Sequence, residues 1–247
     1  MHTKKVVGVI PARYASTRFP GKLLEKIGTK TILQRVWEQC KKSSSLSHVV
    51  VATDSEIIER EVRSFNGEVV MTSPTHQSGT DRVSEAAEKI DAEIIVNIQG
   101  DEPLIQPNVI NQAVSPFFTD ESLMIGTVAS QIRNKEELDN TNIVKVLIDR
   151  HGFAIYFSRL AIPFFRNDSQ ASELSVIRYK HIGLYVYRKE FLLSFSKMLP
   201  SALEKAEKLE QLRAIENGYR IRVEKVNYDA FGVDTPEDLK KIKARFE

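Results

Sequence analysis

The sequence of 247 residues contains a single cysteine, Cys40, which excludes an internal disulfide and a zinc site built from several thiolates. It has no apolar run near the ~18 residues that a membrane span needs. It has no long basic stretch, and its formal net charge of +2 gives no sign of a nucleic-acid partner. The first residues lack the pattern of a secretory signal. We therefore expect a cytoplasmic protein that binds neither membranes nor nucleic acids.

What the sequence does contain is an alternation of apolar runs and helical periodicity. In the first half, strands are predicted at residues 6–10, 48–53, 68–71 and 93–98, and helices at 31–42, 54–66 and 78–90. Asp54 is the expected cap of the second helix, and Gly67 is the expected left-handed C-cap that ends it. This β-α-β order predicts a parallel sheet with helices on both faces.

The second half is richer in β patterns. Strands are predicted at residues 124–132, 144–148, 153–157, 182–187 and 221–226, and helices at 109–118, 203–217 and 236–246. The polar residues 167–175 predict a mobile loop. Together the patterns predict an α/β fold in one domain, residues 1–247, in which a β-rich lobe of about residues 123–190 extends a mixed sheet.

A cationic loop follows the first predicted strand. Residues 11–22 contain Arg13, Arg18 and Lys22, and also hydroxyls such as that of Ser16. Arginine offers bidentate forks to phosphate oxygens and lysine a mobile point charge. The carboxyl end of a strand is where open α/β sheets bind ligands. The spacing matches neither the Walker loop nor the dinucleotide fingerprint. A polyanion site is therefore predicted, the alternative being a solvated basic loop.

A second polar cluster, residues 76–82, lies where a helix is predicted to begin. Backbone N–H groups are free at such a position and the helix dipole is positive there, so a ligand can bind. Gly79 permits close backbone approach. Beside the cationic loop, this cluster predicts a nucleobase and ribose site. The alternative is an ordinary helix cap by Ser78 or Thr80.

Two aspartates are candidate Mg²⁺ ligands. Asp101 follows a predicted strand, and Asp234 precedes the last predicted helix. Mg²⁺ prefers one or two carboxylates completed by water and substrate phosphates. The alternatives are a turn residue for Asp101 and an N-cap for Asp234, since Pro236 suits a first helical turn.

Taken together, these stretches resemble the 3-deoxy-D-manno-octulosonate (Kdo) cytidylyltransferases, or CMP-Kdo synthetases, over nearly the full length. The matching segments, in the family's order, are IPARYASTRFPGK, VVVATD, VVMTSPTHQSGTDR, VNIQGDEP, NIVKV, AIYFSR, KHIGLYVYR, EKLEQLRAIENG and VDTPEDL. The first is shared widely among sugar nucleotidyltransferases, whereas QSGTDR, NIQGDEP, KHIGLYVYR and EQLR together are far more specific.

The resemblance implies a nucleotidyltransferase-type, Rossmann-like mixed sheet and a homodimer to which the β-rich lobe contributes. It also implies the reaction, in which CTP and Kdo give CMP-Kdo and pyrophosphate with Mg²⁺ as cofactor, in lipopolysaccharide biosynthesis. The implied CTP-binding residues are Ala12, Arg13, Ser16, Arg18, Lys22, Gln77, Ser78, Gly79 and Thr80. The implied catalytic set is Lys22, Arg13, Arg18 and Asp101, and the implied metal ligands are Asp101 and Asp234. The sugar would be bound by Gln99, Arg159, His181, Tyr185, Glu210 and Gln211.

Each sugar-site residue also has a plainer interpretation. His181 fits a hydrogen-bonded core histidine, and Glu210 and Gln211 fit the solvated face of a helix on which Arg213 pairs with Glu210. The segment after Ile162 departs from the family's pattern. The sequence therefore leaves open 8-amino-Kdo or another acid sugar as substrate, and a nucleotide-binding protein without turnover.

Overall fold

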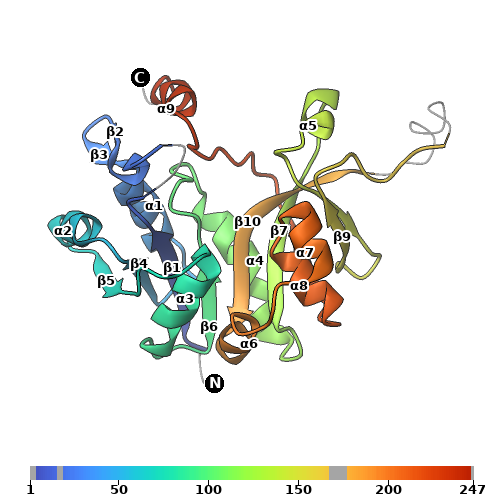
Figure 1. The fold of residues 1–247 in the computed structure, drawn as a ribbon, viewed down its shortest axis with the longest axis horizontal. Coiled ribbons are helices and arrows are strands. Elements are labelled where there is room, and N and C mark those ends of the chain that lie inside the picture. Colours follow the sequence, from blue (N-terminus) through green and yellow to red (C-terminus); the bar gives the residue numbers. More distant parts are fainter. Residues whose placement is uncertain (1–3, 16–18, 167–176, 246–247) are drawn as a thin grey trace.

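The computed structural model describes residues 4–15, 19–166 and 177–245. Ser16, Arg18 and the predicted polar loop at 167–175 lie outside these residues. A nine-stranded sheet runs through the described part of the chain, in the order β11-β7-β10-β6-β1-β4-β5; off this path, β8 pairs with β10, and β9 pairs with β8 (Figure 1). No helix in these segments is long and apolar enough to cross a membrane.

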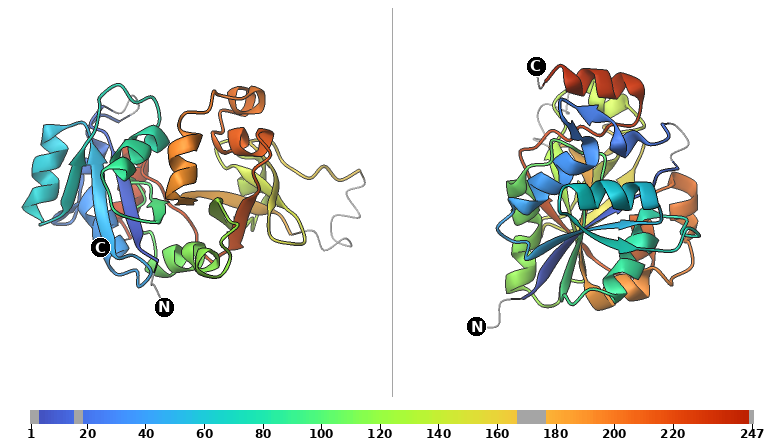
Figure 2. Two further views of the ribbon diagram at one scale, coloured as in Figure 1. Left: turned by 90° about the horizontal axis from the view of Figure 1, so that it is seen from below. Right: turned by 90° about the vertical axis from the view of Figure 1, so that its left-hand side faces the viewer.

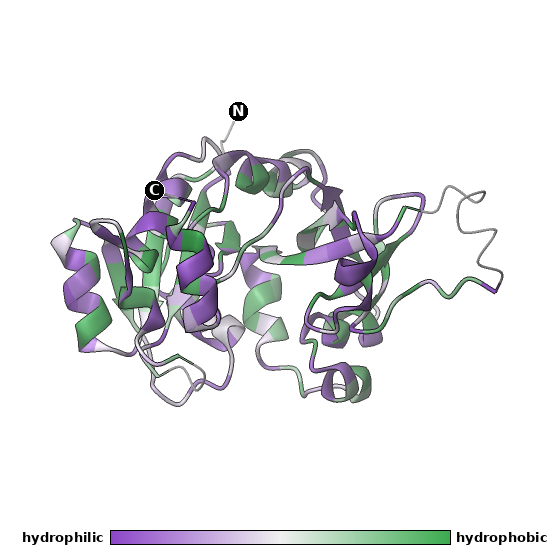
Figure 3. Ribbon diagram, turned by 90° about the horizontal axis from the view of Figure 1, so that it is seen from above, coloured by the Kyte–Doolittle hydropathy of each residue, from purple (hydrophilic) through white to green (hydrophobic). Residues whose placement is uncertain are grey.

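The half of the sheet that is built from the N-terminal strands is parallel. It consists of β1 (Val6–Ala12), β4 (His48–Thr53), β5 (Glu68–Met71) and β6 (Ile94–Asn97). β1 pairs in parallel with both β4 and β6, and β4 pairs in parallel with β5. The strands are almost continuously apolar, as expected where helices cover both faces. Figure 3 shows this as green, hydrophobic strands in that half.

The other half is mixed, as the sequence predicted. Its strands are β7 (Ile125–Gln131), β8 (Lys145–Ile148), β9 (Ala154–Ser158), β10 (Tyr179–Arg188) and β11 (Ile221–Lys225). β10 is antiparallel to β6, β7 and β8, while β11 is parallel to β7. β10 thus joins the two halves. The boundaries 123–190 for a lobe stay a prediction.

Helices cover both faces of the sheet (Figure 2). One face packs against α1 (Ile32–Lys41), α2 (Glu56–Ser64) and α4 (Pro107–Thr119). The other packs against α3 (Gly79–Glu88), α6 (Lys189–Phe195) and α8 (Gln211–Glu216). Beyond the strand ends, α9 (Pro236–Lys243) packs beside β2 (Lys26–Ile27) (Figure 1). The remaining elements are η1 (Lys22–Leu24), β3 (Lys30–Thr31), α5 (Lys135–Asp139) and α7 (Ala202–Glu207). Cys40 lies buried in the first core, and burial raises the pKa of its thiol.

Three local predictions were wrong. Ser55, not Asp54, caps α2, because its hydroxyl accepts from Ile58 N. Asn66, not Gly67, takes the left-handed conformation after α2, with φ 58°, which asparagine tolerates. The single helix predicted at 203–217 is broken into α7 and α8, because Lys208 adopts φ 55°. That break turns Glu210 toward α3.

Residues 226–235 form an extended segment, which we term the crossing segment. It leaves β11 and passes to α9 across the top of the molecule in Figure 1. Tyr228 anchors it in the core, with its hydroxyl 3.4 Å from Glu102 Oε2. Val233 N donates to Asp101 O at 2.9 Å, so Asp234 is held beside the loop that follows β6.

Candidate active site

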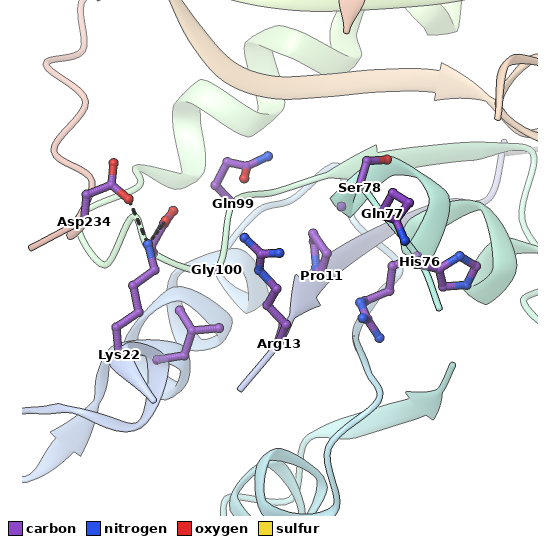
Figure 4. A pocket seen from close by; sticks show the side chains of 14 residues that line it. Pro11, Arg13, Lys22, His76, Gln77, Ser78, Gln99, Gly100 and Asp234 are labelled. Atoms are coloured by element: carbon purple, nitrogen blue, oxygen red, sulfur yellow. Dashed lines mark hydrogen bonds and ion pairs between the residues drawn. The ribbon is translucent and has the colours of Figure 1, made fainter. Parts of the chain in front are cut away.

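A cavity of about 290 Å³ lies where β1 and β6 end and α3 begins (Figure 4). Its lining residues are Pro11, Ala12, Arg13, Lys22, Leu23, His76, Gln77, Ser78, Gly79, Arg82, Gln99, Gly100, Asp101 and Asp234. Gly100 permits the close approach of the two strand ends, because a Cβ there would lie 3.2 Å from Pro11 O. The cavity brings together the cationic loop, the cluster at 76–82 and both candidate metal ligands.

Gly21 gives the cationic loop its final turn. It lies in the left-handed region, with φ 71°, immediately before η1, and its N–H donates to Tyr14 O at 3.0 Å. The turn directs Lys22 into the cavity, where Arg13 approaches from the end of β1.

Lys22 binds both candidate metal ligands. Its Nζ lies 2.6 Å from Asp101 Oδ2 and 3.0 Å from Asp234 Oδ1 (Figure 4). Burial alone would lower the pKa of the ammonium, but the charge of Asp101 and hydrogen bonds to both carboxylates outweigh burial and raise the pKa above its ordinary value. Lys22 is therefore cationic at neutral pH.

The two carboxylates fit a divalent cation. They converge on one ammonium, so a single cation can lie within reach of both. In the described ranges no group of three or more His, Cys, Asp or Glu side chains could hold a metal ion. A metal bound here would need water and phosphate oxygens to complete its shell, which is the coordination that Mg²⁺ prefers.

The structure decides between site residue and helix cap for Asp234 and Ser78. Asp234 does not cap α9, because Thr235 holds that position and accepts from Asp238 N, so the carboxylate of Asp234 is directed to Lys22. Ser78 does cap α3, in a capping box with Asp81. The capping role does not remove Ser78 from the cavity, which it also lines.

Glu210 joins α3 to α8 and is not on a solvated helix face. Its carboxylate accepts from Ser78 Oγ at 3.2 Å and from Thr80 Oγ1 at 2.5 Å. Burial raises its pKa, although the Thr80 hydrogen bond and the nearby Arg213 oppose the rise. The expected pairing with Arg213 is present at 3.6 Å. Thr80 is therefore engaged by Glu210 and does not line the cavity.

Two lining residues with ionisable side chains, Arg82 and His76, were not assigned a role from sequence. Arg82 is buried and donates to Thr72 Oγ1 at 2.6 Å and to Asp54 Oδ2 at 3.0 Å, which ties α3 to the ends of β4 and β5. His76 lies 2.6 Å from a carboxylate oxygen of Glu85. Both residues belong to the cluster at 76–82. The sequence signal that could have identified Arg82 was an arginine among polar residues at the predicted start of a helix.

His181 and Tyr185 lie on β10, with ring centroids 5.3 Å apart. His181 Nε2 is 2.9 Å from Thr127 Oγ1, and its ring meets Phe157 edge-on at 5.1 Å. Burial lowers the pKa of His181 to about 3, so the imidazole is neutral at physiological pH. These contacts fit the plainer interpretation of a hydrogen-bonded core histidine, and they leave a neutral ring for any ligand.

The other predicted sugar residues are spread more widely. Gln99 lines the cavity, and its Nε2 donates to Gly183 O at 3.0 Å. Gln211 is buried, and no residue in the described part of the chain forms a hydrogen bond with its Nε2. Arg159 does not line the cavity, and its guanidinium donates to the backbone carbonyls of Glu207, Thr141 and Lys208. The assignments of these residues to substrate stay predictions.

The sheet is mixed and half parallel, and one cavity at its edge is lined by the cationic loop, the N-terminus of α3 and the paired aspartates. This combination of fold and site defines a nucleotidyltransferase. Comparisons with known proteins agree. A family model described as cytidylyltransferase matches residues 7–225. The chain is 52% identical over 244 residues to a 3-deoxy-manno-octulosonate cytidylyltransferase of Geobacter metallireducens, covering 96% of each chain. It is 49% identical to a namesake from Geotalea daltonii, covering 98% of each.

A solved structure is also similar over 98% of both chains, with a TM-score of 0.92 and 39% identity. It is the CMP:2-keto-3-deoxy-manno-octonic acid synthetase complexed with CTP. The chain belongs to the cytidylyltransferase family, among the 3-deoxy-manno-octulosonate cytidylyltransferases.

Proposed function

We propose that this nucleotidyltransferase transfers CMP from CTP to Kdo, giving CMP-Kdo and pyrophosphate for lipopolysaccharide biosynthesis. The observation that carries the proposal is the meeting of Lys22, Asp101 and Asp234 in one cavity with the N-terminus of α3. Relatives about half identical over nearly the full length, named for this reaction, support the sugar.

The cavity's charges suit in-line transfer. The anomeric hydroxyl of the sugar attacks the α-phosphorus, a new P–O bond forms, and the bond to the β-phosphate breaks as pyrophosphate leaves. Negative charge builds on the leaving oxygens. Arg13 and Lys22 line the cavity where those oxygens would lie and would stabilise that charge. The free N–H groups at the start of α3 would face the nucleoside end.

Mg²⁺ is part of the proposal. Asp101 and Asp234 bring two negative charges to a cavity in which Lys22 supplies one positive charge between them, and a triphosphate adds several more negative charges. A divalent cation bound by the two aspartates would offset that excess. When bound, it would lower the pKa of the attacking hydroxyl. Lys22 would then exchange its aspartate partners for phosphate oxygens.

The proposal extends to a homodimer in the cytoplasm. Exposed apolar side chains are frequent on β9 and in the segments beside it: Ile155 is 57% exposed, Leu160 68%, Phe164 88% and Ile177 51%. We term these four residues the lobe side chains. Large exposed apolar side chains that occur together mark interaction sites. A second copy of the chain would bury these side chains, and their exposure is therefore what a dimer of the kind implied by the family resemblance would use.

The test is pyrophosphate release from purified protein with Mg²⁺, CTP and Kdo, run beside ATP, GTP and UTP and a blank without sugar. Release only with CTP and Kdo together is expected. Release with 8-amino-Kdo or another acid sugar, but not with Kdo, would support CTP as the nucleotide substrate and contradict Kdo as the sugar substrate. CTP binding without release from any sugar would favour a non-catalytic nucleotide-binding protein.

A further inference from the structure

A second cavity, of about 280 Å³, lies where β7 and β11 end, β10 begins and the crossing segment leaves β11. It shares no lining residue with the first cavity. The lining residues that matter here are Ser130 and Arg133 from β7 and the turn after it, Tyr179 from β10, and Lys225, Asn227 and Asp229 from β11 and the crossing segment. Nothing in the proposed function uses this cavity.

Two cations on its wall, Arg133 and Lys225, form no ion pair with a carboxylate of the residues that the structure describes. Arg133 donates one N–H to Asn227 Oδ1 at 2.8 Å, and Lys225 Nζ lies 5.2 Å from the centroid of the Tyr179 ring. Across the described ranges, neither cation lies within 4.0 Å of a carboxylate oxygen. Most of the donors of both side chains are therefore available to a ligand.

The one carboxylate on the wall is already engaged. Asp229 Oδ1 binds Lys180 Nζ at 2.6 Å, and Lys180 also binds Glu137 at 2.5 Å. The hydrogen bond from Lys180 is the main reason that the pKa of Asp229 lies below its ordinary value, and the charge of Arg133 adds to the effect. Among the lining residues, the two cations Arg133 and Lys225 outnumber the one carboxylate, Asp229, so positive charge is in excess at the cavity.

Ser130 supplies the independent observation. Ser130 is 4% exposed and lines the cavity, and its Oγ has no hydrogen-bond partner among the described residues. A buried hydroxyl without a partner costs roughly 1–3 kcal/mol, so such groups call for an explanation. A ligand oxygen in the cavity would satisfy it.

We propose that this cavity binds the phosphate group of a small molecule. Arg133 would give a planar fork of N–H donors, Lys225 a mobile charge, and Ser130 a hydroxyl. These donors come from two stretches of chain, residues 130–133 and the end of β11, and together they suit a tetrahedral oxyanion. The volume approaches the lower end of the range for ligand pockets, about 300 Å³, so a small organic group fits beside the Tyr179 ring.

The experiment follows backbone amide shifts of the ¹⁵N-labelled full chain during titration with inorganic phosphate. The first cavity also attracts phosphate, so a site-resolved signal is needed. Saturable shifts at Ser130, Tyr179 and Asn227 are expected, separate from those at Gly79 and Gly100. Arg133→Met and Lys225→Met should each weaken the response at the second cavity by about tenfold or more, because each removes a charged donor. Lys205→Met, an exposed lysine on α7, is the matched control and should change nothing.

Two further arms keep the test decisive. Glycerol 3-phosphate replaces inorganic phosphate in one arm. Tighter binding of the ester assigns the site to a phosphorylated metabolite, and equal binding assigns it to free phosphate. Thermal unfolding checks that the variants fold. If Arg133→Met does not fold, Lys225→Met alone tests the proposal. Shifts confined to the first cavity, or a second-cavity response that survives both substitutions, would overturn the proposal. The outcome does not depend on activity with Kdo.

Discussion

At the scale of single residues, the site depends on one lysine that holds two carboxylates together. Lys22 and Asp234 are 212 positions apart, and no periodicity in the sequence joins them. The sequence did assign Lys22, Asp101 and Asp234 to the site, from loop chemistry and family resemblance. It could not predict that Lys22 binds both aspartates, because that contact depends on how the crossing segment packs.

A neutral His181 makes stability depend on pH. Its pKa is near the ordinary value of about 6.5 when unfolded and about 3 when folded. The unfolded chain therefore binds the proton more readily, and the stability due to neutral His181 is present above pH 6.5 and is lost as the pH falls toward 3.

Urea unfolding at pH 7 and pH 5 tests this linkage. The wild type should lose about 1 kcal/mol or more relative to His181→Gln over that interval, because glutamine does not titrate. An equal loss in both proteins would show that folding does not lower the pKa of His181.

At the scale of elements, the break between α7 and α8 decides where Glu210 lies. A continuous helix would leave Glu210 on a solvated face, as the helical periodicity predicted. Lys208 in the left-handed region redirects the chain, and the carboxylate meets the hydroxyls at the start of α3. Periodicity alone does not reveal such a break when no glycine or proline marks it.

The contact between α3 and α8 predicts that two substitutions of Thr80, to valine and to serine, change the stability of the fold by different amounts. Thr80→Val keeps the shape but leaves the half-buried Glu210 without its shorter hydrogen bond, and it should destabilise the fold by about 1–3 kcal/mol. Thr80→Ser keeps the hydroxyl and is the matched control. Urea unfolding measures both. Equal stability of the valine and serine variants would mean that the Glu210 contact contributes nothing.

At the scale of the whole molecule, the sequence predicted the sheet and its long helices better than the short elements and the side-chain contacts between them. Continuous apolar runs identified the buried parallel strands, because a sheet covered on both faces leaves no polar alternation. The short elements α5, α6, β2 and β3 were missed, since each has too few residues for a period to appear. Arg159, assigned from resemblance, lies away from the cavity because the carbonyls of the α7–α8 turn bind it.

A homodimer that covers the lobe side chains predicts which surface substitutions separate the copies. Phe164→Asp should shift the chain from dimer to monomer, because a charge would replace an apolar side chain in a buried interface. Leu199→Asp is the control, since Leu199 is 87% exposed but follows α6, outside the lobe. Light scattering after gel filtration gives the mass. A monomeric wild type, or a dimer that tolerates Phe164→Asp, would reject this surface.

The central claim is that the paired aspartates, Asp101 after β6 and Asp234 in the crossing segment, make the cavity catalytic. The most direct measurement is turnover of CTP and Kdo, with CTP affinity in parallel, for Asp101→Asn beside the exposed control Asp91→Asn. We predict that Asp101→Asn lowers turnover by at least about 100-fold while CTP still binds, and that Asp91→Asn retains full turnover. Unchanged turnover in Asp101→Asn would contradict the account.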